Sequence, residues 1–286
     1  MPSTASVDRP VLAPQSNSRS FARAFRDLAT GLEQRELWAH LGWQDIKQRY
    51  RRSFLGPIWI TISMGVTALA MGLLYSQLFQ QEIADFLPSL TVGLIVWGLI
   101  SGCILEGADV FVANEGLMKQ LPAPLSVHVY RMVWRQVLLF AHNLIIYFVL
   151  LVIFPKPLHW TVIAAFPALA LLALNGVWIG IVAGIMSTRF RDISPILGSM
   201  VQLLFFLTPI VWSEKILLKN GGAQAERANL AQINPLYHYL DIIRAPMLGE
   251  DQQAYHWYIV LAITVAGWAL ALFFLRNYRA RVAYWV

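Results

Sequence analysis

Six long apolar stretches constrain the fold of this chain more than any other feature. A helix needs roughly 20 mostly apolar residues to cross a hydrocarbon core about 30 Å thick, and each stretch approaches that length with almost no polar face. Only 13% of the residues are charged, whereas a soluble domain has about a quarter. We therefore predict an all-α integral membrane protein with six spans, at about 54–79, 87–112, 132–154, 160–186, 194–213 and 257–275.

Lysine and arginine are distributed unevenly between these stretches. If both termini are cytoplasmic, the inside holds 17 of the 22 basic residues, in the N-terminal region, the loops after the second and fourth spans, and the C-terminus. Cytoplasmic loops carry an excess of Lys and Arg, so we expect a multi-pass inner (plasma) membrane protein with both termini in the cytoplasm. The excess of basic residues is then explained by the membrane topology. It does not predict nucleic-acid binding, because that function would place the basic residues in a soluble module.

The segment before the first span has the pattern of an amphipathic helix. Residues 1–20 are rich in Pro and Ser and are predicted to be a disordered cytoplasmic tail. From 21 to 50, apolar residues recur at helical spacing opposite a charged face, which predicts an interface helix on the inner membrane surface. It is either a passive anchor or a platform for a cytoplasmic partner. The first apolar set is Phe21, Phe25, Leu28 and Leu32.

The loop between the second and third spans, 113–130, is long for a simple connection. Asn114 is placed to cap a short helix over 115–120, and two prolines follow it. Leu117 and Met118 would share one face of that helix and enter a partner groove. The alternative is a structured turn. The loop between the fourth and fifth spans is tight and basic, which we attribute to positive-inside anchoring. Asp192 is placed to neutralise Arg189 or Arg191.

The external segment, 214–256, predicts a short helix that lies at or dips into the outer interface. Asn234 and Pro235 form its start signal. Its aromatic residues would form an interfacial belt, which we favour, or would stack on sugars. They are Tyr237, Tyr239, Tyr255, Trp257 and Tyr258.

Motifs that carry catalysis are scarce in the sequence. It contains no G-x-x-x-x-G-K-[ST], H-E-x-x-H or G-x-S-x-G. Glu106 and Asp109 lie one turn apart near the inner end of the second span, where a carboxylate at the bilayer centre would cost about 2.5–3.5 kcal/mol. Such groups are functional candidates. They would either pair with Arg or Lys to lock an inner gate or contact substrate.

Four segments in this order carry a family resemblance: QRYRRSFLGPIWITIS, ANEGLMKQLPAPLSVHVYR, STRFRDISPIL and INPLYHYLDIIRAPML. Together they resemble the permease subunit of bacterial ABC polysaccharide exporters, most closely the Wzm-like O-antigen and galactan exporters, which are related to teichoic-acid and capsule exporters. The resemblance covers roughly residues 37–281.

The resemblance implies a type-2 ABC exporter fold with short external gate helices. It also implies a homodimer that pairs with two copies of a cytoplasmic ATPase subunit. ATP and Mg would be bound by that partner, so no cofactor is expected in this chain, and the chain itself would not be an enzyme. The cargo would be a lipid-linked polysaccharide moving between the two copies of the first and fifth spans.

The resemblance also assigns candidate roles. ATPase coupling would fall to Glu115, Leu117, Met118 and Lys119; the external gate to Asn234, Pro235, Tyr237, Tyr239 and Arg244. The channel aromatics, which would face sugar rings or pack between helices, are Trp59, Tyr75, Phe79, Phe205 and Phe206.

Arg49, Arg51 and Arg52 precede the first span within about one helical turn. Each basic residue near an anionic leaflet gains about 1 kcal/mol, so membrane anchoring alone explains the cluster. The alternative is recognition of a lipid diphosphate, which arginine forks bind bidentately.

Two other classes of function stay open. One is a permease of the same superfamily that exports a drug or a small lipid. The other is a membrane enzyme acting on lipid-linked glycans, which would need a carboxylate or histidine cluster on one external face.

Overall fold

The computed structural model describes residues 19–120, 123–155, 159–212 and 231–286. Within these ranges every regular element is a helix. The elements are α1 (Phe21–Glu33), α2 (Arg35–Arg49), α3 (Ile58–Leu78), α4 (Ile83–Ala108), η1 (Val112–Asn114), α5 (Glu115–Gln120), α6 (Leu125–Ile153), η2 (Trp160–Ala164), α7 (Ala165–Arg189), α8 (Ile193–Leu207), α11 (Pro235–Met247) and α12 (Ala254–Trp285).

Five helical segments in the described ranges are long and apolar enough to cross a membrane: α3, α4, α6, η2 with α7, and α12. They correspond to five of the six predicted spans. The predicted span at 194–213 contains α8, which has only 15 residues and rises about 22 Å, less than the hydrocarbon core. The six-span count therefore stays a prediction, and residue 213 lies outside the described part.

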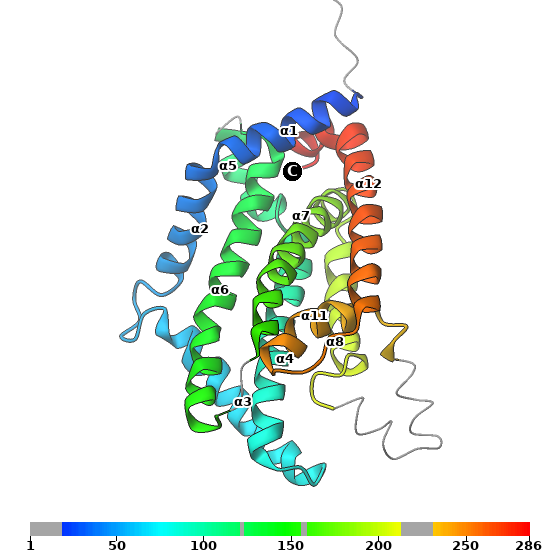
Figure 1. Cartoon of the computed structure of the whole chain (residues 1–286). Helices are drawn as coiled ribbons and strands as arrows, with labels where there is room; N and C mark the ends of the chain where they lie inside the picture. The colour runs from blue at the N-terminus through cyan, green and yellow to red at the C-terminus, as the bar shows by residue number, and fades with distance from the viewer. Residues whose placement is uncertain (1–18, 121–122, 156–158, 213–230) are drawn as a thin grey trace, which may run out of the picture.

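Helix α4 forms the centre of the bundle (Figure 1). It packs against α3, α6, α7, α8 and α11, and its side chains from Phe86 to Ile100 are mostly buried. Small residues let its backbone approach α7 closely: a Cβ atom on Gly107 would lie 3.0 Å from the Cα of Gly180. Close approach of this kind is typical of membrane helix pairs, which associate through packing.

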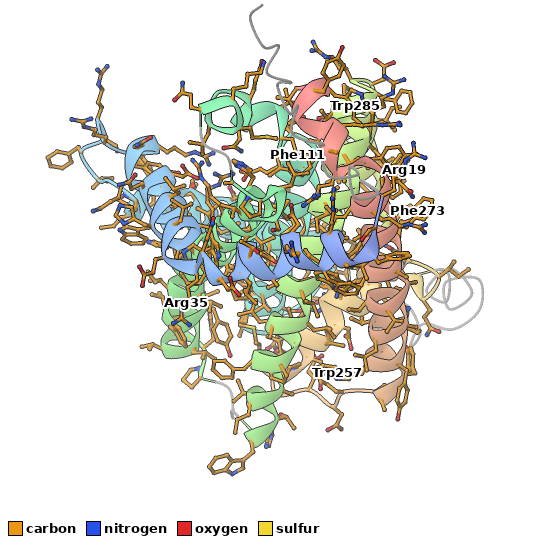
Figure 2. The ribbon with its side chains drawn as sticks, turned by 90° about the horizontal axis from the view of Figure 1, so that it is seen from above. Arg19, Arg35, Phe111, Trp257, Phe273 and Trp285 are labelled. Atoms are coloured by element: carbon orange, nitrogen blue, oxygen red, sulfur yellow. The ribbon has the colours of Figure 1, made fainter. Side chains whose placement is uncertain are left out.

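The predicted interface helix over 21–50 consists of two helices. The break falls at Gln34, which caps both α1 and α2. Helix α1 lies across the end of the bundle against α6 and α12, as the view onto that end shows, whereas α2 runs along α6 (Figures 1 and 2). The prediction of a single helix was wrong. Helix α2 packs along α6, and no local pattern in the sequence encodes this contact between distant segments.

The two faces of α1 have different surroundings. Ala24, Asp27 and Gly31 are buried against the chain, whereas Phe21, Phe25 and Leu32 are exposed. Three of the four apolar residues assigned to the membrane surface are therefore exposed, whereas the fourth, Leu28, packs against the bundle.

Helix α11 lies inside the bundle, packed against α4, α7 and α12. Tyr237 and Tyr239 are only 7% and 4% exposed. The interfacial-belt prediction was therefore wrong for these two tyrosines, and they are also closed to sugars in this conformation. Tyr258, on α12, is exposed.

Candidate functional site

The best-organised polar cluster in the described part of the chain joins α2, α4 and α6. Its centre is Asp45 on α2, whose carboxylate accepts hydrogen bonds from two arginines of α6. Arg131 binds it bidentately, with 2.8 Å from Nε to Oδ2 and a second contact from Nη2 to Oδ1. Arg135 donates from Nη1 to Oδ2 at 2.6 Å. The spacing of 131 and 135 places both guanidinium groups on one face of α6.

The cluster extends from α6 to α4 through Glu106. Its Oε2 accepts hydrogen bonds from Arg135, at 3.1 Å from Nε and 2.5 Å from Nη2. Its Oε1 lies 3.9 Å from Nη2 of Arg49, the last residue of α2. Of the two interpretations of Glu106, the structure therefore shows pairing with arginine. Asp109 is exposed, and no ion pair to it is seen in the described ranges.

Asp45 has a perturbed acidity. Burial raises its pKa, but the hydrogen bonds and positive charges of Arg131 and Arg135 outweigh burial and hold the pKa below its ordinary value. The carboxylate thus stays ionised, and α2 is held to α6 by charge-assisted hydrogen bonds, which are the stronger kind.

Two cavities open beside this cluster. One, of about 340 Å³, is lined by Arg49, Glu106, Asp109, Arg131 and Arg135 among others. The second, of about 410 Å³, lies between α3, α4 and α6. Its polar lining comes from Arg49, Tyr50, Ser63, Thr67, Gln136 and Asn143. Arg49 lines both cavities. It therefore connects the charged cavity with the cavity that lies between the spans.

The other two arginines of the predicted trio are placed differently. Helix α2 ends at Arg49, and Arg51 and Arg52 are exposed in the turn that follows. The expectation that all three share a helical turn was wrong. The connection lies beside α6, partway down its length (Figure 1), where Thr61 of α3 donates to the carbonyl of His142 at 3.0 Å.

Helix α5 confirms the short helix expected over 115–120. Asn114 does not cap it: its Nδ2 donates to the carbonyl of Val110 at 2.7 Å, and its Oδ1 accepts from Arg131 at 3.1 Å. The start of α5 is thereby tied to the Asp45 cluster.

The exposed face of α5 is polar. Lys119 donates to Glu115 at 2.5 Å, and this hydrogen bond, followed by the lysine charge, lowers the pKa of Glu115. Met118 packs against the chain's own core, and Leu117 is half-buried. The surface offered to a partner is therefore mainly that of Glu115 and Lys119.

The channel candidates divide into two groups. Tyr75 and Phe205 pack against the core, and the ring of Phe205 meets that of Trp97 edge-on at 5.7 Å. Trp59, Phe79 and Phe206 are exposed. The exposed rings of Phe79 and Phe206 still contact the first two, Phe79 stacked on Tyr75 at 5.9 Å and Phe206 edge-on to Phe205 at 5.4 Å.

The gate candidates tie α11 to the end of α8. Asn234 caps α11 by accepting from the N–H of Leu236 at 3.0 Å, and its Nδ2 donates to Thr208 at 2.8 Å. Arg244 donates to the carbonyl of Pro209 at 2.5 Å. Pro235 occupies the first helical position, as the start signal predicted.

Sequence reasoning missed several polar residues that join distant segments, including the three that follow. Asp27 binds the start of α6, Asp45 centres the cluster, and Asn175 accepts from Tyr239 at 2.7 Å and donates to Thr264 at 2.8 Å. One signal in the sequence could have found such residues, namely a single polar residue within an apolar span, such as Asn175. A buried polar group needs a hydrogen-bond partner, so its presence predicts a contact with another segment.

Comparisons with known proteins agree with this architecture. A family model described as ABC-2 type transporter matches residues 36–248. The chain is 26% identical over 213 residues to an O-antigen export system permease protein RfbA of Myxococcus xanthus, which covers 74% of this chain and 76% of that protein. It is 21% identical over 175 residues to a protein of the same name from Klebsiella pneumoniae, covering 61% of this chain and 68% of the relative.

Proposed function

Because the chain belongs to the ABC-2 type transporter family, we propose that it is the membrane subunit of an ATP-driven exporter of a lipid-linked polysaccharide of the O-antigen or galactan type. It works as a homodimer with two copies of a separate ATPase subunit, which bind ATP and Mg. Both termini lie in the cytoplasm, and the segment at 214–256 faces outward.

The observation that carries this proposal is the similarity to O-antigen export permeases over most of the chain. The match with the family model includes α2, the Asp45 cluster, α5 and α11. A drug or small-lipid permease would share the family, but the relatives matched here are named for O-antigen export.

The end of the bundle that carries α1 and α5 supports an ATPase docking surface. Both helices lie there, together with the end of α12 (Figure 1). The exposed Glu115 and Lys119 give this surface specific charges, and the bond from Asn114 to Arg131 connects it to the Asp45 cluster. A displacement of α5 would therefore reach α2, α4 and α6 through hydrogen bonds.

Helices α3 and α8 support a dimer with the cargo path between the copies. Both pack on α4 and carry many exposed large apolar side chains, including Trp59 and Phe206. Apolar surfaces of this extent are covered by lipid or by another helix.

Arg49 is our candidate for the lipid diphosphate. It is the one member of the trio that lines both cavities, and its contact with Glu106 is long enough, at 3.9 Å, to be exchanged for a phosphate. Arg51 and Arg52, exposed on the turn, suit headgroup anchoring.

The test is removal of this chain in its host. We expect surface polysaccharide to disappear and its lipid-linked precursor to accumulate inside, with recovery on re-expression. An unchanged amount of surface polysaccharide, with no accumulated precursor, would exclude the proposed cargo.

A further inference from the structure

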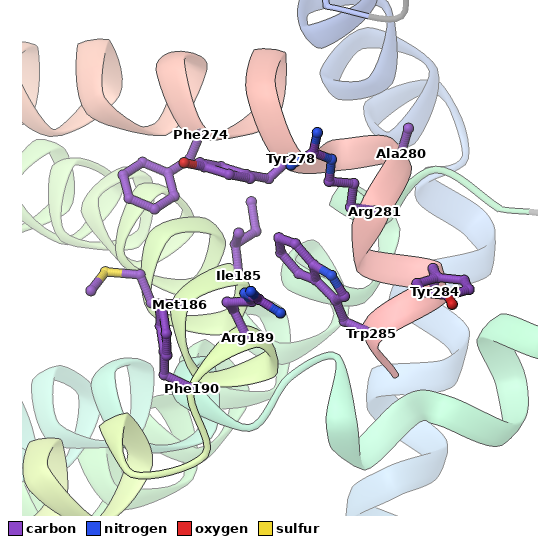
Figure 3. Close-up of a pocket in the computed structure, with 10 residues that line it drawn as sticks. All are labelled: Ile185, Met186, Arg189, Phe190, Phe274, Tyr278, Ala280, Arg281, Tyr284 and Trp285. Carbon is purple, nitrogen blue, oxygen red and sulfur yellow. The ribbon is translucent and has the colours of Figure 1, made fainter.

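A cavity of about 820 Å³ lies between the final turns of α7 and α12 (Figure 3). It does not belong to the Asp45 cluster or to the two cavities beside it, with which it shares no lining residue. Its lining combines apolar groups, aromatic rings and two arginines: Ile185, Met186, Arg189, Phe190, Phe274, Tyr278, Ala280, Arg281, Tyr284 and Trp285.

The two arginines have no carboxylate partner in the described part of the chain. The guanidinium carbon of Arg189 lies 5.3 Å from the ring centroid of Trp285 and 5.7 Å from that of Phe190. The ion pair with Asp192 that the sequence suggested does not form, so that expectation was wrong. No Asp or Glu lines the cavity, so no acidic side chain of the lining balances the two positive charges.

The depth of this cavity matches that of lipid headgroups. Arg189 is the first charged residue after the apolar run of η2 and α7, and Arg276 is the first after the apolar run of α12. The cavity thus begins where both helices leave the hydrocarbon. Tyr278, Tyr284 and Trp285 are residue types enriched at that boundary.

We propose that this cavity binds an anionic phospholipid of the adjacent leaflet. The headgroup phosphate lies between Arg189 and Arg281, whose forks suit phosphate oxygens, and the acyl chains descend past Phe274 and Met186. Basic pockets between membrane helices on the cytoplasmic side are known to bind anionic headgroups. Only the identity of that leaflet as the cytoplasmic one rests on the proposed function.

The test uses the purified full chain in mild detergent, titrated with dioleoylphosphatidylglycerol or dioleoylphosphatidylcholine and measured by native mass spectrometry. We expect one phosphatidylglycerol to bind more tightly than any phosphatidylcholine. The double change Arg189→Gln with Arg281→Gln should weaken it by about thirtyfold, since each arginine near an anionic headgroup contributes about fivefold. The control Arg191→Gln with Arg276→Gln removes the same charge next to the cavity and should bind like wild type.

Three results would overturn the proposal. The first is equal weakening in both double variants, which would indicate general surface charge. The second is displacement of the lipid by millimolar inorganic phosphate, which would indicate a free anion as ligand. The third is unchanged lipid binding together with lost ATPase-subunit binding in the Arg189 and Arg281 variant, which would indicate a protein contact.

A single substitution tests the site even if the double variant fails to fold. Arg281 is exposed, so Arg281→Gln alone should leave the elution profile unchanged while weakening phosphatidylglycerol by about fivefold, against no change for Arg276→Gln. Because binding is measured on the isolated chain, its result is independent of whether polysaccharide export is the correct function.

Discussion

The carboxylate of Asp27, on α1, accepts the backbone N–H groups of Leu125 and Ser126 at 3.3 and 3.1 Å. These are the first two residues of α6, whose N-terminal donors have no partner within their own helix. Ser126 returns a hydrogen bond to the carbonyl of Asp27 at 2.7 Å, and Arg279 of α12 lies 3.4 Å from the same carboxylate. One buried acid therefore caps α6 from a distance of about a hundred residues in sequence and fixes α1 across the end of the bundle.

Removal of this cap should destabilise the protein. Asp27→Ala is expected to cost about 0.5–2 kcal/mol, the usual range for a lost N-cap, and to release α1 from α6. The measurement is thermal unfolding in detergent together with proteolysis at α1. Glu33→Ala is the matched control, because Glu33 is an exposed acid of the same helix. Equal effects of the two changes would contradict the capping role.

The Asp45 cluster should make stability depend on acid pH. The folded pKa of Asp45 lies below its ordinary value of 3.8, so its contribution is fully present above about pH 4 and is lost as the pH falls through the lower, folded pKa. Asp45→Asn should lower the melting temperature at neutral pH and reduce the loss on acidification. The double change with Arg135→Gln should cost less than the sum of the two single changes, because both remove the same interaction. Additive costs would show that the pair is not coupled.

Conservative substitution should separate Arg49 from its neighbours. Arg49→Lys keeps the charge but loses the bidentate fork, so we expect normal insertion with strongly reduced export. Arg51→Lys with Arg52→Lys should export normally, because anchoring needs charge alone. The measurement is surface polysaccharide at matched membrane levels of each variant. Full export by a variant in which Arg49, Arg51 and Arg52 are all replaced by lysine would show that the three arginines act only as membrane anchors.

Reversal of the charges on α5 should disturb the ATPase subunit and spare the fold. Glu115→Lys with Lys119→Glu retains an i,i+4 pair within the helix but inverts the charges that α5 exposes. We expect an unchanged melting temperature of the isolated chain and loss of coupled ATP hydrolysis in the complex with the partner. Normal export by this variant would remove Glu115 and Lys119 from the docking surface.

The proposed topology has a direct test by chemical labelling. In a variant with Cys103→Ala, single cysteines are placed at Ser16, Gln224 and Ala283. An impermeant maleimide added to intact cells should label only the cysteine at 224, since both termini are expected inside. Cys103 is buried, and changes in a packed core are felt, so normal export by the Cys103→Ala variant is the control for this background. Labelling at 16 or 283 in intact cells would reverse the orientation.

The sequence by itself determined the elements whose cause is local. The apolar runs predict five of the observed helices because the thickness of the hydrocarbon core sets their length. Asn234 and Pro235 predict the start of α11 because capping involves neighbours in the chain. The short helix over 115–120 was also expected, but the capping role predicted for Asn114 was wrong, because its side chain bonds to Val110 and Arg131 instead.

Tertiary structure alone decided which polar groups meet and which aromatic groups are buried. The partners Asp45 and Arg131 are 86 residues apart, and no periodicity within either segment specifies that α2 packs on α6. The sequence around Tyr237 is compatible with an interfacial belt, yet the packing of α11 buries this side chain in the core. Arg189 has an acid three residues away but stacks on Trp285, because the end of α12 brings that ring to it. Helix formation depends on neighbours in the chain, whereas ion pairs, burial and cavities depend on segments that only packing brings together.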